Sequence, residues 1–158
     1  MKTHRFGGHF TLSLKNSVGM VAKIDPKDGY DYMNELHSSP YQRHMIAEIN
    51  REYKPSLVVL DGIEAFVTEG PDRGRVVRPG VILAGEDRVA LDAVGVGILR
   101  LFGTTPMVSK GNIFEQEQIA RAVELGVGAK SFEEVEMIPL GKPTEDFVKK
   151  LEGVLARS

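Results

Sequence analysis

The sequence contains no cysteine, and this absence removes several kinds of chemistry from a chain of 158 residues. Disulfide bonds, a cysteine-ligated iron–sulfur cluster and a thiol nucleophile are all excluded. A chain of this length can bury enough apolar surface to fold without cross-links. Since disulfides mark oxidising compartments, their absence fits a reducing, cytoplasmic location.

An excess of either charge is also lacking, because 20 lysines and arginines stand against 22 aspartates and glutamates. Nucleic acid is not expected as a partner, since phosphate backbones are held by a basic surface. The longest apolar run, residues 89–102, is interrupted by Asp92 and Arg100 and is too short to span a membrane. No secretion signal is recognisable at the N-terminus.

The common catalytic motifs are missing as well. The sequence has no GxxxxGK[ST], GxGxxG, GxSxG or HExxH pattern. P-loop nucleotide hydrolysis, Rossmann dinucleotide binding, the serine-hydrolase elbow and the usual zinc peptidase are therefore not indicated. The four histidines, His4, His9, His37 and His44, show no strong metal-ligand spacing.

What is present is an alternation of apolar segments that predicts a single α/β domain, with a mixed or mostly parallel sheet flanked by helices in a three-layer-like arrangement. Residues 57–60 and 81–84 are apolar runs typical of buried strands, and 57–60 is expected to be buried on both faces. Helices are expected from about Pro40 to before Pro55 and over residues 89–102, 113–125 and from 144. A short strand is expected near 135–140, and loops over 20–38 and 68–80. Residues 10–18 fit a strand or a helix, with helix slightly favoured.

Two predicted strands lead into carboxylates, Asp61 after residues 57–60 and Asp87 after residues 81–84. Ligands of open α/β sheets bind beyond the carboxyl ends of strands, so both are candidate site residues. Each also has a simpler explanation, because Asp-Gly forms turns and an aspartate before a helix is a natural N-cap. If the two strands are parallel the carboxylates meet at one edge, and if they are antiparallel they lie at opposite ends.

Asp92 is a carboxylate inside an otherwise apolar helix, so it must cap, pair with Arg88 or Arg100, or face a site. Glu69 lies in the long loop 68–80, and such loops often carry function. We expect Asp61 and Asp92 to face one cavity that also receives Glu69. Together they form a candidate metal site, and oxygen ligands favour magnesium, manganese or calcium.

Four separated motifs occur in a recognisable order: "KTH" at 2–4, "SLKNSVGMV" at 13–21, "LVVLDGIEAFVTEGP" at 57–71 and "ILAGEDRVALDAVGV" at 82–96. With these motifs the chain resembles the domain-of-unknown-function family 362. The resemblance implies a cytoplasmic α/β domain, sometimes fused to a ferredoxin-like module, and family members are often labelled iron–sulfur cluster-binding proteins. Because this chain has no cysteine, it cannot supply the cysteine ligands of an iron–sulfur cluster that this label implies.

The resemblance predicts one domain of this family over residues 1–158. Family members carry a strand and a helix before the "KTH" motif, whereas this chain begins at the motif. The chain is therefore expected to be a shortened member, a fragment, or a sequence with a misassigned start.

Two functions are compatible with these residues. The first is an enzyme that holds a polar small molecule or a divalent metal and uses Lys15 or His4 as proton carrier. The other expected ligand-binding residues are Lys2, Asn16, Asp61, Glu69 and Asp87. The second is a non-catalytic binding or accessory subunit, related to iron–sulfur proteins, that completes its sheet as a homodimer or with a partner subunit.

Overall fold

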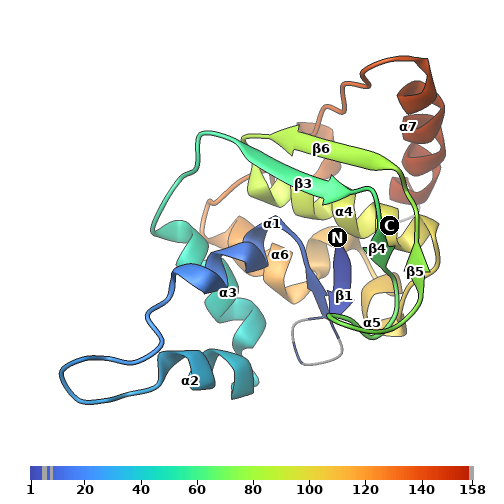
Figure 1. Cartoon of the computed structure of the whole chain (residues 1–158). Helices are drawn as coiled ribbons and strands as arrows, with labels where there is room; N and C mark the ends of the chain where they lie inside the picture. Colours follow the sequence, from blue (N-terminus) through green and yellow to red (C-terminus); the bar gives the residue numbers. More distant parts are fainter. Residues whose placement is uncertain (5–6, 8, 157–158) are drawn as a thin grey trace.

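Helix α4 (Arg88–Leu101) runs through the middle of the computed structural model, which describes residues 1–4, 7 and 9–156 (Figure 1). Its apolar residues are buried on nearly every side, as its sequence predicts. Asp87 caps it by accepting hydrogen bonds from the N–H groups of Val89 and Ala90, at 2.8 and 2.9 Å. Much of the hydrophobic core lies along this helix.

The strands form two small sheets. They are β1 (Lys2–His4), β2 (His9–Thr11), β3 (Val58–Gly62), β4 (Ala65–Phe66), β5 (Val76–Val77) and β6 (Val81–Gly85). One sheet has the order β2-β1-β4-β5, in which β1 is antiparallel to β2 and parallel to β4. The other is the antiparallel pair β3-β6. The predicted α/β class and the mixed sheet are confirmed.

Helices pack around α4, and the pair β3-β6 lies across one side of it (Figure 1). The α-helices are α1 (Ser13–Asn16), α2 (Tyr32–Ser38), α3 (Gln42–Arg51), α4, α5 (Pro106–Ser109), α6 (Glu117–Glu124) and α7 (Lys142–Leu155). Short 3-10 turns are η1 (Ser17–Met20), η2 (Ile113–Glu115) and η3 (Phe132–Glu134). Helices α1, α6 and α7 all contact α4, while α3 contacts α1 and α6 (Figure 1).

In the described part of the chain, helices pack on one face of the pair β3-β6. Leu60 and Val81 are buried on the inner face, whereas Val59 and Ile82 on the outer face are 61% and 63% exposed. The strand expected to be buried on both faces is therefore half-buried, and the apolar run 57–60 reflects an uncovered apolar surface.

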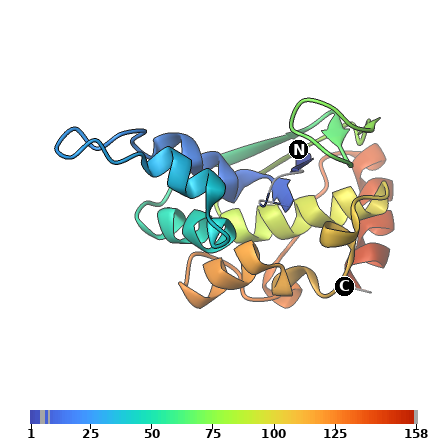
Figure 2. The ribbon, with the colours of Figure 1, turned by 90° about the horizontal axis from the view of Figure 1, so that it is seen from below.

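Several local predictions differ from the structure. Within the expected loop 20–38, Asp31 caps helix α2 by accepting the N–H of Asn34 at 2.8 Å, so only residues 21–31 project as a loop (Figure 2). No strand forms at 135–140, where the chain is irregular. The ambiguous segment 10–18 contains the end of β2 followed by α1. No helix within the described ranges is both long and apolar enough to cross a membrane.

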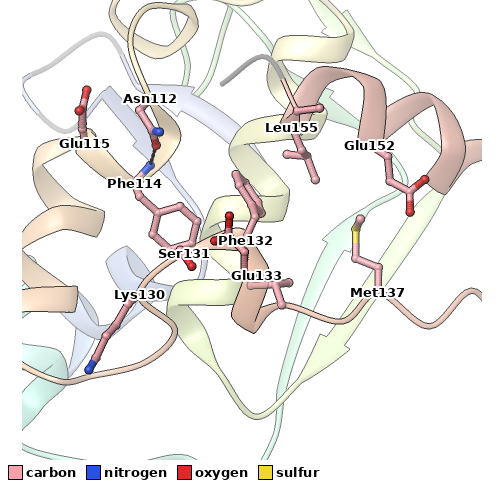
Figure 3. A pocket seen from close by; sticks show the side chains of 12 residues that line it. Asn112, Phe114, Glu115, Lys130, Ser131, Phe132, Glu133, Met137, Glu152 and Leu155 are labelled. Carbon is pink, nitrogen blue, oxygen red and sulfur yellow. Dashed lines mark hydrogen bonds between the residues drawn. The ribbon is translucent and has the colours of Figure 1, made fainter.

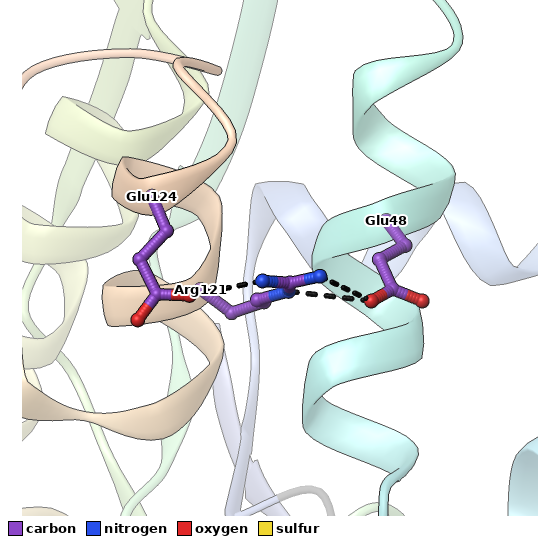
Figure 4. Close-up of polar contacts among 3 residues, drawn as sticks. All are labelled: Glu48, Arg121 and Glu124. Atoms are coloured by element: carbon purple, nitrogen blue, oxygen red, sulfur yellow. Dashed lines mark hydrogen bonds and ion pairs between the residues drawn. The ribbon is translucent and has the colours of Figure 1, made fainter.

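An ion-pair group joins α6 to α3 (Figure 4). Arg121 donates to Glu48 of α3 at 2.8 and 3.2 Å and to Glu124 of its own helix at 3.0 Å. Because these side chains are partly exposed, the ion pairs contribute little to stability, and the helices are held together mainly by apolar packing.

Two glycines in α4 allow leucine side chains to pack close against this helix. A Cβ atom on Gly95 would lie 2.8 Å from Leu12 Cδ1, and one on Gly97 would lie 2.5 Å from Leu155 Cδ2 of α7. The absence of a side chain at these positions is therefore what lets α7 and residue 12 reach the core helix.

We expect Gly97→Val to destabilise the protein by about 1–3 kcal/mol, because the added side chain overpacks the α4–α7 contact. Gly153→Ala in α7 is the matched control, since a Cβ there meets nothing within 4 Å. It should stabilise the protein by about 0.5–1 kcal/mol through helix propensity. Urea unfolding measures both. Equal stability of the two variants would contradict the packing described.

Candidate functional site

The carboxylate of Asp92 lies at the N-terminus of the short helix α1. Its Oδ1 accepts hydrogen bonds from the N–H of Ser13 at 2.7 Å, from Ser13 Oγ at 2.5 Å and from the N–H of Leu14 at 3.3 Å. Gln118 of α6 donates to Oδ2 at 3.3 Å. Of the alternatives open from the sequence, Asp92 therefore takes the capping role, for a helix far away in the chain, and does not pair with Arg88 or Arg100.

A second group of buried polar side chains holds α1 from its other side. Asn50 of α3 donates to the carbonyl of Leu14 at 2.8 Å and accepts from Ser17 Oγ at 2.8 Å and from Arg88 Nη1 at 2.6 Å. Arg88 also donates to the Tyr53 carbonyl at 2.6 Å and lies over the Tyr53 ring, 4.6 Å from its centre. This buried guanidinium is satisfied by amide oxygens and a ring face.

Burial raises the pKa of the Asp92 carboxyl to about 7, although its hydrogen bonds from Ser13, Leu14 and Gln118 favour the charged form. The side chain is 0% exposed. Asp92 is therefore a structural residue whose protonation state changes near neutral pH.

Lys15 of α1 is also buried, but its surroundings differ from those of Asp92. The side chain is 7% exposed, and Nζ has no hydrogen-bond partner among the described residues. Burial and, to a smaller extent, the positive charge of Lys2 together lower the pKa of Lys15 to about 8. Lys2 is half-buried in β1, and Asn16 is exposed at the end of α1.

The loop that contains Glu69 packs against β1. Gly70 adopts a left-handed conformation with φ of 51°, and a Cβ atom there would collide with the carbonyl oxygen of Thr3. Glu69 itself is exposed and also left-handed, with φ of 58°. A non-glycine residue in this region is strained, and such strain often occurs at functional sites. The "EGP" and "KTH" motifs are thus neighbours in space, with His4 half-buried at the end of β1.

The two carboxylates that follow the predicted strands do not meet. Because β3 and β6 are antiparallel, with Asp61 opposite Ile82 and Val58 opposite Gly85, Asp61 and Asp87 lie at opposite ends of the pair. Asp61 is exposed and its Oδ1 accepts the N–H of Ile63 at 2.8 Å, as in a simple turn. Asp87 is the N-cap of α4 and also accepts the N–H of Ala129 at 2.7 Å.

The metal site predicted from Asp61, Glu69 and Asp92 is not formed. Asp92 is enclosed by its hydrogen-bond donors, whereas Asp61 and Glu69 are exposed. In the part of the chain that the structure describes, no group of three or more histidine, aspartate or glutamate side chains is placed to hold a metal ion. With no cysteine in the sequence, the chain also offers no ligands for a cysteine-bound iron–sulfur cluster.

Two hollows on the surface were not found from the sequence. One, of about 610 Å³, lies between η2, residues 130–137 and α7. Phe114 and Phe132 meet edge to face at its wall, with ring centroids 5.0 Å apart, and Figure 3 shows Leu155 beside them while Lys130 extends away. The other, of about 560 Å³, is a groove along β6 and is lined by Asp87 alone of the predicted site residues. Both hollows are lined in part by the irregular segment after η3. The path of this segment could not be predicted, because no sequence pattern specifies it.

The chain belongs to the family described as Domain of unknown function (DUF362), whose family model matches residues 1–97. The "KTH", "LKN", "LDG", "EGP" and "DRVALD" motifs all lie within the match. No curated protein and no solved structure matches the chain significantly. Residues 98–158 lie outside the match, so one family domain over the whole chain stays a prediction.

Replacing Asp92 with asparagine should change how stability depends on pH. Because the pKa of the folded carboxyl is raised from 3.8 to about 7, the folded state binds the extra proton, and that stabilisation is lost as the pH rises through 7. The unfolding free energy of the wild type relative to Asp92→Asn should therefore fall by at least about 1 kcal/mol between pH 5 and 8.

Urea unfolding across this pH range measures the difference, with Asp146→Asn on the exposed face of α7 as control. The control should show no such trend. A wild-type advantage that grows from pH 5 to 8 would mean that the pKa of Asp92 is lowered in the folded protein, contrary to this assignment.

Proposed function

We propose that the chain binds a small anionic molecule, a carboxylate or a phosphate compound, at Lys15, and that Lys15 carries a proton to or from it. The observation that carries this proposal is the buried Lys15 amine, which has no hydrogen-bond partner among the described residues and lies near a second lysine, Lys2.

A buried ammonium without a partner costs several kcal/mol. The cost is avoided if the amine loses its proton or if an anion pairs with it. Lys2 favours both outcomes, because its charge repels the Lys15 proton and attracts the same anion. In other proteins, a second cationic group beside a desolvated lysine lowers the pKa of its amine and so makes the amine reactive.

The other residues of the proposed site come from β1, α1 and the loop after β4. Lys2 supplies a second positive charge, Asn16 an amide, and His4 an imidazole at the end of β1. Glu69 borders the same strand, because the adjacent Gly70 packs on Thr3. Asp61 lies beside the start of β1, because the Met1 nitrogen donates to its carbonyl oxygen at 2.7 Å, and this supports its inclusion in the proposed site.

The pKa of about 8 gives Lys15 a role that an exposed lysine cannot fill. A proton carrier works best when its pKa lies near the working pH. At pH 7–8 Lys15 exists in both protonation states, so it can accept a proton from a bound molecule and return it. A bound anion raises the pKa again, so binding and proton uptake are coupled.

We expect inorganic phosphate, acetate or pyruvate to bind wild-type protein with uptake of a proton at pH 8. Isothermal calorimetry in two buffers of different ionisation enthalpy measures both the affinity and the proton. Lys15→Met should lower the affinity at least 10-fold, whereas Lys149→Met, on the exposed face of α7, should leave it unchanged.

Lys15→Met should also fold, since it removes a desolvated charge. We expect its melting temperature at pH 7 to rise by about 2–4 °C, equivalent to roughly 1 kcal/mol. The proposal fails if none of the three anions binds the wild type, or if binding is equal in Lys15→Met. A strongly destabilised Lys15→Met would instead indicate a structural partner for the amine.

A further inference from the structure

The free edge of β6 faces an apolar groove. Within the described residues β6 pairs only with β3, so the backbone groups on its other edge are available. The groove runs along this edge and is bounded by α4, residues 134–140 and α7, and β3 contributes nothing to its lining. Figure 1 shows β3 and β6 as a two-stranded ribbon lying across α4. A two-stranded sheet is marginal by itself, and a free edge is a ready template for another strand.

The floor of the groove fits the side chains of an added strand. Ala90, Leu91 and Val94 of α4 lie under it, and Phe147 and Leu151 of α7 close one side. A strand hydrogen-bonded to β6 would place every second side chain on this floor, at the spacing of a β-strand. The volume of about 560 Å³ is enough for several such side chains.

Every ionisable residue that lines the groove is acidic. These residues are Glu86, Asp87, Glu134 and Glu136. Asp87 is occupied as the N-cap of α4, and Glu134 accepts the N–H of Lys130 at 2.9 Å. Glu86 and Glu136 are exposed, one at the end of β6 and one on the opposite wall. The groove therefore presents an apolar floor and an acidic rim.

We propose that this groove binds an extended segment of a partner protein, which adds to β6 as a third strand, fills the floor with alternate apolar side chains and carries lysine or arginine next to Glu86 and Glu136. Main-chain hydrogen bonds supply affinity in such strand addition, while pockets and charges supply specificity. The acidic rim favours a basic partner segment over a second copy of this chain. Two copies placed groove to groove would bring their acidic rims together, and the like charges would repel each other. The site shares no residue with the Lys15 site, so either can fail alone.

The test uses an array of seven-residue peptides with valine, isoleucine, leucine or threonine at the alternating positions. Each peptide is made with lysine ends, with glutamate ends and with proline in the middle. Fluorescence anisotropy then gives the affinity of the best members for the full chain. Lysine-ended peptides should bind at least 10-fold more tightly than glutamate-ended ones, and the proline versions should not bind, since proline cannot complete the ladder.

Two variants locate the site. Ala90→Trp fills the groove and should abolish binding, whereas Ala22→Trp in the exposed loop 21–31 should not. The double variant Glu86→Lys and Glu136→Lys should reverse the preference, so that glutamate-ended peptides bind more tightly. Because both positions are exposed, we expect this variant to fold.

The proposal is overturned if no peptide of the array binds, or if the charge reversal leaves the preference unchanged. It is also overturned if the chain forms a dimer at micromolar concentration that Ala90→Trp dissociates. In that case the occupant is a second copy.

Discussion

The position of α1 depends on one buried contact, the carboxylate of Asp92 against the first N–H groups of that helix. A helix of four residues has no stability of its own, because nucleating a helix costs more than a single turn returns. Asp92 supplies hydrogen-bond acceptors at the start of this turn, since its carboxylate accepts two main-chain N–H groups and the Ser13 hydroxyl. Asn50 and Arg88 then fix the other end of the turn, so α1 is held from α3 and α4 together.

This anchoring explains why Lys15 is buried. Ser13 and Leu14 are bound to Asp92, so the next residue is carried inward and its amine is placed away from water, with no hydrogen-bond partner among the described residues. The protein thus contains two buried ionisable groups, and burial disfavours the charged form of both. They differ in their partners, because Asp92 accepts hydrogen bonds from four donors and anchors α1, whereas the Lys15 amine has no hydrogen-bond partner among the described residues and its charge costs stability. Proteins retain such a cost where the group serves function, which is why the proposed function rests on Lys15.

The sequence predicts the local elements well and the long-range contacts poorly. The apolar periodicity of α4 and the apolar run of β6 are strong local signals, and both elements formed where expected. The direction of β3 relative to β6 is not a local property, because a connection of this length permits either direction, so the sequence left open whether Asp61 and Asp87 meet, and the antiparallel pairing keeps them apart. Likewise, the odd charge of Asp92 marked it as important, but its partner Ser13 lies 79 residues away. Lys15 was selected for its residue type, whereas its burial follows only from that contact.

The proposed function requires that the Lys15 amine is desolvated and can bind an anion. The pKa of Lys15 is the most direct measure of this desolvation. Carbon-13 labelling at Cε of lysine gives one NMR titration curve for each lysine, and Lys15→Met identifies the curve of Lys15. The account predicts a midpoint near pH 8 for this residue, well below the ordinary 10.5, and a rise when inorganic phosphate is added. A midpoint near 10.5 that phosphate does not move would show that the amine is solvated, and would contradict the account.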